Sequence, residues 1–330
     1  MLDVTRRNLL AGAAALSAAA ASPLSGARAA TPAVSKQAPG FYRYKVGDIE
    51  VTVVTDGVNR GPLMENFVTN VKADEVKAAL EADHRSRDIF DNTFTPVVLN
   101  TGGKLVLIDT GTGEANLAAS KGTAGQFTAN LAAAGITPAQ IDTVVISHYH
   151  GDHMNGLLKA DNSLAFPNAE ILVPAKEHAY WMDDGEMSRA PKGRIEGLFK
   201  NNRRVFSGDV LKRTRTYEWE KEVVPGVIAH GTPGHSVGHT SFVVSSGTGK
   251  VYVQSDVTHV PYLFVRHPDW HAAYDQDGAM AEATRRKVYD MLAAEKMMVQ
   301  GFHYPFPAHA YIEKSGNGYR ETMVAWNAAI

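Results

Sequence analysis

The feature that most constrains this chain is a short run of histidine and aspartate directly after an apolar segment. Thr143–Ile146 is predicted to be a buried strand, and His148, His150, Asp152 and His153 follow within a few residues. Imidazole nitrogen and carboxylate oxygen are ligands that suit zinc and similar metals. The spacing His-x-His-x-Asp-His allows the two ends of one loop to face two adjacent metal ions. The alternative is a polar loop whose histidines occur there by chance.

This motif resembles that of the metallo-β-lactamase superfamily, and later segments extend the resemblance in the same order along the chain. Thr232-Pro-Gly-His235 resembles a ligand turn of the superfamily, and apolar strands lead to Asp256 and to His303. The segment Asp109-Thr-Gly111 follows another apolar strand. It resembles the element of the superfamily whose aspartate orients a metal-binding histidine without binding the metal itself. Taken alone, Asp109 would be interpreted as a turn-capping residue.

The resemblance implies two divalent metal ions per chain, with zinc expected and manganese, cobalt or iron as alternatives. It implies the following ligands: His148, His150 and His235 for one ion, Asp152, His153 and His303 for the other, and Asp256 between them. The catalytic candidates are Asp152, Asp256 and His259. His259 occupies the place where related lactonases carry a tyrosine, and protonation of the leaving group is the hypothesis for it. Metal coordination lowers the pKa of water from 15.7 to about 7, so the implied nucleophile is a bridging hydroxide.

The amino-acid composition excludes several kinds of site and partner. The 330 residues include no cysteine, which excludes disulfides, thiolate zinc ligands and a cysteine nucleophile. The formal net charge of −2 gives no reason to expect a nucleic-acid partner. A small-molecule substrate is expected instead, and a homodimer is common in the branch that the chain resembles.

The first 30 residues are predicted to be a signal peptide. Arg6-Arg7 precedes an Ala/Leu-rich run that ends near Ala21, and Ala27-Arg-Ala29 resembles a cleavage site. Paired arginines favour a twin-arginine signal, with a Sec signal or an N-terminal anchor as alternatives. The run is short for a bilayer span, so we expect cleavage, a periplasmic or secreted protein, and no stable membrane insertion.

Residues 31–40 are predicted to be a linker and residues 41–330 a single domain. The alternation of apolar strands and amphipathic helices indicates an α+β protein. The resemblance makes this a four-layer αβ/βα sandwich, with two mixed β-sheets flanked by helices. Helices are expected at residues 73–82, 125–134 and 277–296, and one strand at residues 222–229.

Within the superfamily the chain most resembles the methyl parathion hydrolase-like branch, through segments such as Ala165-Phe-Pro-Asn-Ala169 and His303-Tyr-Pro-Phe-Pro307. This implies an exported hydrolase of an ester, a lactone or a phosphotriester. Trp181 and Phe199 stand where that branch carries aromatic residues of the substrate pocket, although plain packing is an equal alternative. Hydrolysis of another activated bond, such as hydrolytic dehalogenation, and metal binding without catalysis are the competing functions.

Overall fold

The computed structural model describes residues 37–330, of which Pro39–Ile330 form one compact unit. The predicted signal peptide, residues 1–30, and most of the predicted linker lie outside the described residues. Among the described residues, no helix combines the length and the apolarity needed to cross a membrane. The predicted limits of the domain and the predicted export therefore stay predictions.

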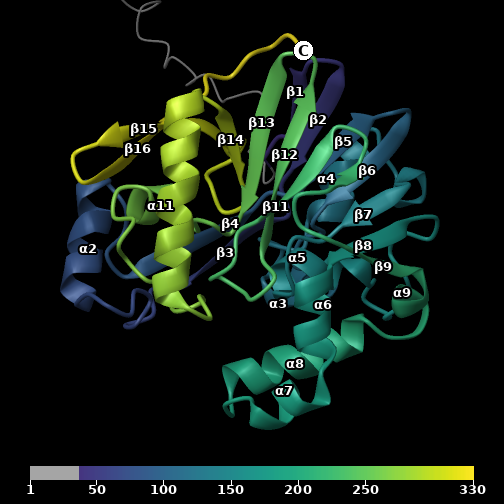
Figure 1. Cartoon of the computed structure of the whole chain (residues 1–330), viewed down its shortest axis with the longest axis horizontal. Helices are drawn as coiled ribbons and strands as arrows, with labels where there is room; N and C mark the ends of the chain where they lie inside the picture. Colours follow the sequence, from purple (N-terminus) through teal and green to yellow (C-terminus); the bar gives the residue numbers. More distant parts are fainter. Residues whose placement is uncertain (1–36) are drawn as a thin grey trace, which may run out of the picture. The chain divides into compact units, whose positions relative to one another are not determined.

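Two seven-stranded sheets form the centre of the unit (Figure 1). The strands of the first sheet, in spatial order, are β1 (Phe41–Val46), β2 (Ile49–Val54), β5 (Val97–Thr101), β6 (Lys104–Ile108), β7 (Thr143–Val145), β8 (Glu170–Pro174) and β9 (Thr214–Tyr217). Antiparallel pairing runs from β1 to β6, and parallel pairing runs from β6 to β9. This sheet is therefore mixed, as predicted.

The second sheet follows the chain order without interruption. Its strands are β10 (Glu222–Val224), β11 (Val227–Gly231), β12 (Thr240–Ser246), β13 (Gly249–Ser255), β14 (Met298–Gly301), β15 (His309–Ser315) and β16 (Gly318–Met323). Only β13 and β14 pair in parallel. The single strand predicted at residues 222–229 is wrong, because Pro225-Gly226 turns the chain there and Gly226 adopts a φ of +79°.

The two sheets face each other across an apolar core. Strand residues of both sheets contribute to it, including Val53, Leu99 and Val106 from the first sheet and Phe242 and Val251 from the second. Because successive strand residues point to opposite faces, the neighbouring apolar residues of the same strands face outward and require helices to cover them. This accounts for the four layers.

Helices cover both outer faces. The helices of the first half of the chain are α2 (Ala73–Ala82), α3 (Ala115–Ala119), α4 (Phe127–Ala133) and α5 (Gly151–Met154). Those of the second half are α6 (Ala175–Met182), α7 (Asp184–Arg189), α8 (Arg194–Val205), α9 (Gly208–Arg213), α10 (Pro261–Phe264) and α11 (Gly278–Glu295). Val288 and Leu292 of α11 pack on the second sheet. The predicted helices at residues 73–82 and 277–296 are confirmed, while α4 begins two residues later than predicted.

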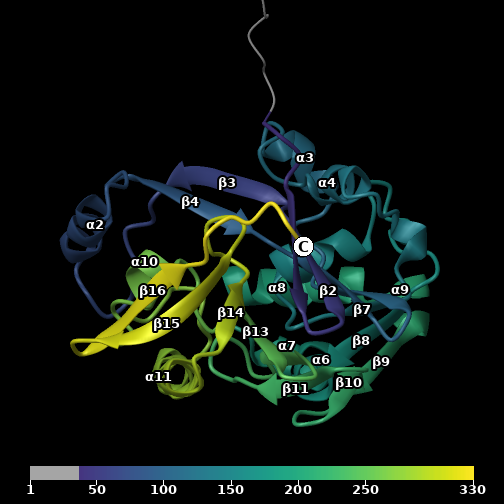
Figure 2. The same cartoon turned by 90° about the horizontal axis from the view of Figure 1, so that it is seen from above.

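A separate hairpin crosses the open end of the sandwich. It consists of β3 (Gly57–Pro62) and β4 (Ile89–Phe94), with α2 between them in the chain and at the far end of the hairpin in space (Figure 2). The sequence pattern did not reveal these strands, because Gly57-Val-Asn-Arg-Gly-Pro62 has no apolar alternation. This hairpin forms one wall over the site described next.

Candidate metal centre

The candidate ligands lie on loops that leave neighbouring strands at one end of the two sheets. Asp109 directly follows β6 and has a φ of +59°, and Ser255 ends β13 with a φ of +50°, so both residues have a left-handed backbone. Such conformations are uncommon for residues other than glycine and concentrate at functional sites. They turn the chain sharply, so Asp109 and Asp256 lie inside the end of the sandwich rather than outside it.

The structure brings the first predicted ligand set together. His150 Nδ1 lies 3.1 Å from His148 Nε2 and 2.8 Å from His235 Nε2. The Asp256 carboxylate lies 3.3 Å from His235 Nε2 and 3.9 Å from His148 Nε2. All four side chains are buried. One nitrogen or oxygen of each residue therefore faces a common point.

The second predicted set converges on the opposite side of Asp256. Asp256 Oδ1 lies 3.2 Å from His153 Nε2, and Asp256 Oδ2 lies 3.1 Å from His303 Nε2. Asp152 Oδ2 lies 3.5 Å from His303 Nε2 and 3.8 Å from His153 Nε2. The Asp256 carboxylate thus lies within 4 Å of histidines from both sets, which is the place that the resemblance to the superfamily implied for it.

Hydrogen bonds behind the ligands fix which ring nitrogen faces the centre. His153 Nδ1 lies 2.8 Å from Asp109 Oδ2, and His303 Nδ1 lies 2.8 Å from the carbonyl oxygen of Thr93. His235 Nδ1 lies 2.8 Å from Asp275 Oδ1. Since each of these acceptors requires a proton on Nδ1, each Nε2 is left with a free lone pair.

The same reasoning applies to the first histidine of the motif. Ser147 donates its hydroxyl proton to Asp109 Oδ2 at 2.8 Å and accepts from His148 Nδ1 at 3.0 Å. His148 Nε2 therefore also faces the centre with a lone pair. Asp109 thus orders two ligand histidines, one directly and one through Ser147, which is the kind of role that the sequence predicted for it.

The donor set fits two divalent cations. Lone pairs of His150 and His235 face each other at 2.8 Å, an arrangement that is repulsive unless a cation or a proton lies between them. In addition, the buried atoms His153 Nε2, Asp256 Oδ1 and His259 Nδ1 have no hydrogen-bond partner. Buried polar atoms without partners are rare in proteins, and a metal ion would satisfy the first two.

Charge interactions differ between the two ligand sets. Burial lowers the pKa of His148, His150 and His235 well below the usual value. Burial acts in the same direction on His153 and His303, but the nearby carboxylates together outweigh it and raise the pKa of both. These carboxylates are Asp256, Asp109 and Asp152 for His153, and Asp256 and Asp152 for His303. The carboxylates around His153 and His303 therefore favour a positive charge at these two side chains, and a proton is enough to supply it.

A buried carboxylate that the sequence analysis missed ties two ligand loops together. Glu177 Oε1 accepts from the backbone N–H of Tyr149 at 3.0 Å, and Glu177 Oε2 accepts from the N–H of Gly238 at 2.7 Å. Trp181 Nε1 and Ser236 Oγ donate to the same carboxylate. Glu177 lies on α6 outside any motif, so its sequence gave no signal of this role.

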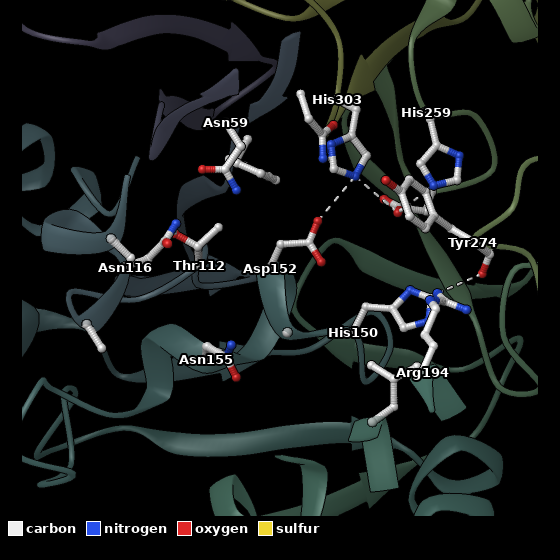
Figure 3. A pocket seen from close by; sticks show the side chains of 17 residues that line it. Asn59, Thr112, Asn116, His150, Asp152, Asn155, Arg194, His259, Tyr274 and His303 are labelled. Atoms are coloured by element: carbon white, nitrogen blue, oxygen red, sulfur yellow. Dashed lines mark hydrogen bonds and ion pairs between the residues drawn. The ribbon is translucent and has the colours of Figure 1, made fainter. Parts of the chain in front are cut away.

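A cavity of about 560 Å³ opens over the centre (Figure 3). Its polar wall comes from the β3–β4 hairpin, α3 and the motif loop, with Asn59, Asn92, Thr112, Asn116 and Asn155. The opposite wall comes from α8, the loop between β13 and α10, and the segment before α11, with Arg194, Leu198, His259 and Tyr274. Asp152, Asp256, His150 and His303 form its floor. A small molecule that enters the cavity therefore reaches both ligand sets.

The predicted pocket aromatics require a correction. Trp181 and Phe199 are fully buried, their rings pack together at 4.6 Å, and neither lines the cavity. Both belong to the apolar core between α6, α8 and the first sheet. The aromatic residues that do line the cavity are Phe94 and Tyr274.

His259 lies where the sequence analysis expected it, at the cavity wall, with Nε2 3.6 Å from Asp256 Oδ2. Burial lowers its pKa to about 3, and the proximity of His303 and Arg285 adds to the shift. Two metal ions beside it would lower this pKa further. Burial therefore favours the neutral form of His259, and the hypothesis that it protonates the leaving group stays a prediction.

Comparison with known proteins agrees with the fold and the ligand sets described above. The family profile described as the metallo-beta-lactamase superfamily matches residues 95–293. N-acyl homoserine lactonase AiiA of Bacillus thuringiensis subsp. kurstaki is 27% identical over 167 residues, which cover 50% of this chain and 56% of that protein. The chain thus spans about half the length of the curated relatives that it matches.

Two solved structures resemble the fold over nearly their full length. AidC, a dizinc quorum-quenching lactonase in complex with a product, N-hexnoyl-L-homoserine, has a TM-score of 0.80 and 26% identity. The match covers 87% of this chain and 98% of AidC. The hydrolase AbOPH of the beta lactamase superfamily has a TM-score of 0.80 and 25% identity, covering 88% of this chain and 100% of that one. The narrower resemblance to the methyl parathion hydrolase-like branch stays a prediction.

Proposed function

The chain belongs to the metallo-β-lactamase superfamily, and from this premise we propose that it is a hydrolase of carboxylic esters, lactones among them, that depends on two divalent metal ions. Zinc is the expected metal. The observation that carries the proposal is that Asp256 joins two ligand sets whose free lone pairs converge below one open cavity. A protein that only stores or carries metal has no need for such a cavity.

The ions would supply the nucleophilic hydroxide and the Lewis acid that polarises the scissile carbonyl. The residues of the chain hold this chemistry in place. Asp256 sets the separation of the two ligand sets, and Asp109 keeps His153 in one tautomer. Glu177 fixes two ligand loops relative to each other, so that the centre needs little reorganisation during the reaction.

Tyr274 is the protonated group in the cavity that is best suited to bind the carbonyl oxygen. Burial raises the pKa of Tyr274, so its hydroxyl keeps its proton and can donate a hydrogen bond at neutral pH. It lies beside His259, with ring centres 5.4 Å apart. Burial favours the neutral form of His259, and we assign this residue the role of a wall residue that orients Asp256 or a substrate oxygen.

Lactones are favoured over other esters because two relatives, AidC and AiiA, are described as lactonases. A phosphotriester is the second candidate, and it is kept because the resemblance to the methyl parathion hydrolase-like branch suggests it.

One assay separates the ester candidate from the phosphotriester candidate. The metal-loaded protein is given a homoserine lactone, an aryl acetate and a dialkyl aryl phosphate before and after treatment with a chelator. The proposal expects hydrolysis of the first two that is lost with the metal and restored by zinc. Turnover of the phosphate alone would contradict the ester assignment, and no turnover of any substrate would contradict the enzyme assignment.

We also propose export through the twin-arginine pathway, on the strength of Arg6-Arg7 and the apolar run that follows. This pathway carries folded proteins, which suits a protein that must acquire its metal ions before export. A reporter fused to residues 1–40 should reach the periplasm, and the Arg6→Lys, Arg7→Lys double variant should not. Export that persists in the variant would contradict the proposal.

A further inference from the structure

Arg194 places a positive charge in the cavity wall, beside the ligand candidate His150. Arg194 is the first residue of α8, and its Nη2 donates to the carbonyl oxygen of Tyr274 at 3.2 Å. Its Cζ lies 5.5 Å from the centre of the Tyr274 ring. Figure 3 shows its side chain next to the His150 ring and below Tyr274. Desolvation lowers the pKa of Arg194, but a guanidinium starts from so high a value that it stays charged at neutral pH.

Arg194 lacks the acidic partner that two other cations of α8 have. On the same helix, Arg203 pairs with Asp184 at 2.6 Å, and Lys200 pairs with Glu196. Within residues 37–330, Arg194 forms no such ion pair, and its polar contacts are with a carbonyl oxygen and a ring nitrogen. The carboxylates of Asp152 and Asp275 act on Arg194 from beyond ion-pair distance. A partly desolvated cation without a carboxylate in direct contact favours an incoming anion.

The His150 ring nitrogen that lies next to Arg194 gives a second, independent reason to expect an anion there. His150 Nδ1 faces the ligand set, so a His150 that holds a metal ion carries its proton on Nε2. Arg194 Nη2 lies 3.4 Å from this Nε2. Both groups are then donors and cannot bond to each other. An acceptor oxygen placed in the cavity in front of them would satisfy both.

We propose that Arg194 and the Nε2–H of His150 form a carboxylate-binding site, so that the preferred substrates are esters that carry a carboxylate a short carbon spacer away from the scissile carbonyl. This inference rests on the proposed function. His150 spans the two parts of the substrate, with one nitrogen toward the reacting carbonyl and the other toward the carboxylate. Guanidinium groups match carboxylates through paired hydrogen bonds. Leu198, one turn further along α8, lines the same cavity and suits the carbon spacer.

The test compares two aryl esters that differ in charge, the mono-para-nitrophenyl ester of glutaric acid and para-nitrophenyl butyrate, on the zinc-loaded protein. Arg194→Gln should lower kcat/KM for the glutarate ester by about 10- to 100-fold, chiefly through KM, as loss of charge-assisted hydrogen bonds predicts. The loss of kcat/KM for the butyrate ester should be smaller by about fivefold or more, because this ester carries no carboxylate for Arg194 to bind. Arg194→Lys, which keeps the charge but loses the paired geometry, should recover part of the loss.

Lys200→Gln is the matched control, because it removes a positive charge from the same helix outside the cavity. This variant should leave kcat/KM for both esters unchanged. Equal losses on both esters in Arg194→Gln, or a glutarate-specific loss in Lys200→Gln as large as that in Arg194→Gln, would overturn the carboxylate site.

A binding measurement keeps this inference separate from the proposed function. Glutarate is titrated into the zinc-loaded protein by calorimetry, which needs no turnover. It should bind the wild type and the Lys200→Gln variant alike, and Arg194→Gln about tenfold or more weakly. If the wild type hydrolyses no ester but shows this difference, the proposed function fails and the carboxylate site stands. Equal glutarate affinity in wild type and Arg194→Gln would refute the site whatever the activity.

Discussion

Asp109 Oδ2 lies 2.8 Å from His153 Nδ1, at the inner end of β6. The same carboxylate accepts the backbone N–H of Ser147 through Oδ1 at 2.8 Å. It is almost completely buried. One residue therefore sets the tautomer of a ligand and anchors the start of the ligand loop, which explains why a charged group closes an otherwise apolar strand.

Asp109→Asn tests this relationship. The amide of the variant keeps one acceptor oxygen but turns an N–H group toward donors and loses the negative charge behind His153. We expect the affinity for the metal ion on the Asp152, His153 and His303 side to fall by about 10- to 100-fold. Competition with a chelator of known affinity measures it. Asp161→Asn, at an exposed loop position, serves as control, and an Asp109→Asn protein that binds two ions as tightly as that control would contradict the assignment.

Glu177→Gln tests the link between the ligand loops. Each carboxylate oxygen of Glu177 accepts two hydrogen bonds, at least one of them from an N–H group, so the amide nitrogen of Gln necessarily faces at least one N–H donor. We expect the free energy of unfolding of the metal-free protein to drop by about 2 kcal/mol, since buried donors lose their partner. Chemical denaturation measures it, with the exposed Glu170→Gln as the matched control. A stability equal to that of the control would show that Glu177 is not needed to join the loops.

Leu198 and Phe199 are adjacent on α8 but face different surroundings. Leu198 lines the cavity, whereas Phe199 is fully buried against Trp181. Leu198→Ala should therefore change KM for ester substrates with little effect on Tm. Phe199→Leu should do the reverse, lowering stability by about 1 kcal/mol with KM unchanged. If Phe199→Leu alters KM more than Leu198→Ala does, the cavity wall has been assigned to the wrong residue.

Acidification of the metal-free protein should protonate the histidines of the centre in order. Nearby carboxylates raise the pKa of His153 and His303, while burial lowers that of His148, His150 and His235. As pH falls, protonation should therefore begin at His153 and His303. NMR spectra of the imidazole side chains during stepwise acidification of the chelator-stripped protein follow each histidine. Protonation of the other three histidines first would contradict the charge pattern.

Much of the fold and the ligand set follows from the sequence because both depend on local patterns. Apolar runs that end in His or Asp predict strands with polar side chains at their ends, and the resemblance to the superfamily then implied the seven ligand candidates that the structure brings together. The resemblance also singled out Asp109, which on its own pattern would be interpreted as a turn-capping residue.

What could not be predicted depends on contacts between distant segments. Glu177, Arg194 and Asp275 lie outside any motif, and their roles arise only when helices and loops pack beside the centre. The assignment of Phe199 to the pocket failed because neighbouring helix positions differ by about 100° in direction, which a single sequence without its partners cannot orient. The Pro225-Gly226 turn, in contrast, was visible as a turn dipeptide and could have been predicted.

Metal content measured together with activity tests the central claim most directly. The protein is stripped with a chelator, reconstituted with zinc and analysed by elemental analysis, beside an Asp256→Ala variant that removes the residue shared by both ligand sets. The account predicts about two zinc ions per wild-type chain, ester hydrolysis that appears only with the metal, and loss of both in the variant. Hydrolysis that survives chelation, or an Asp256→Ala protein that keeps two ions and full activity, would contradict it.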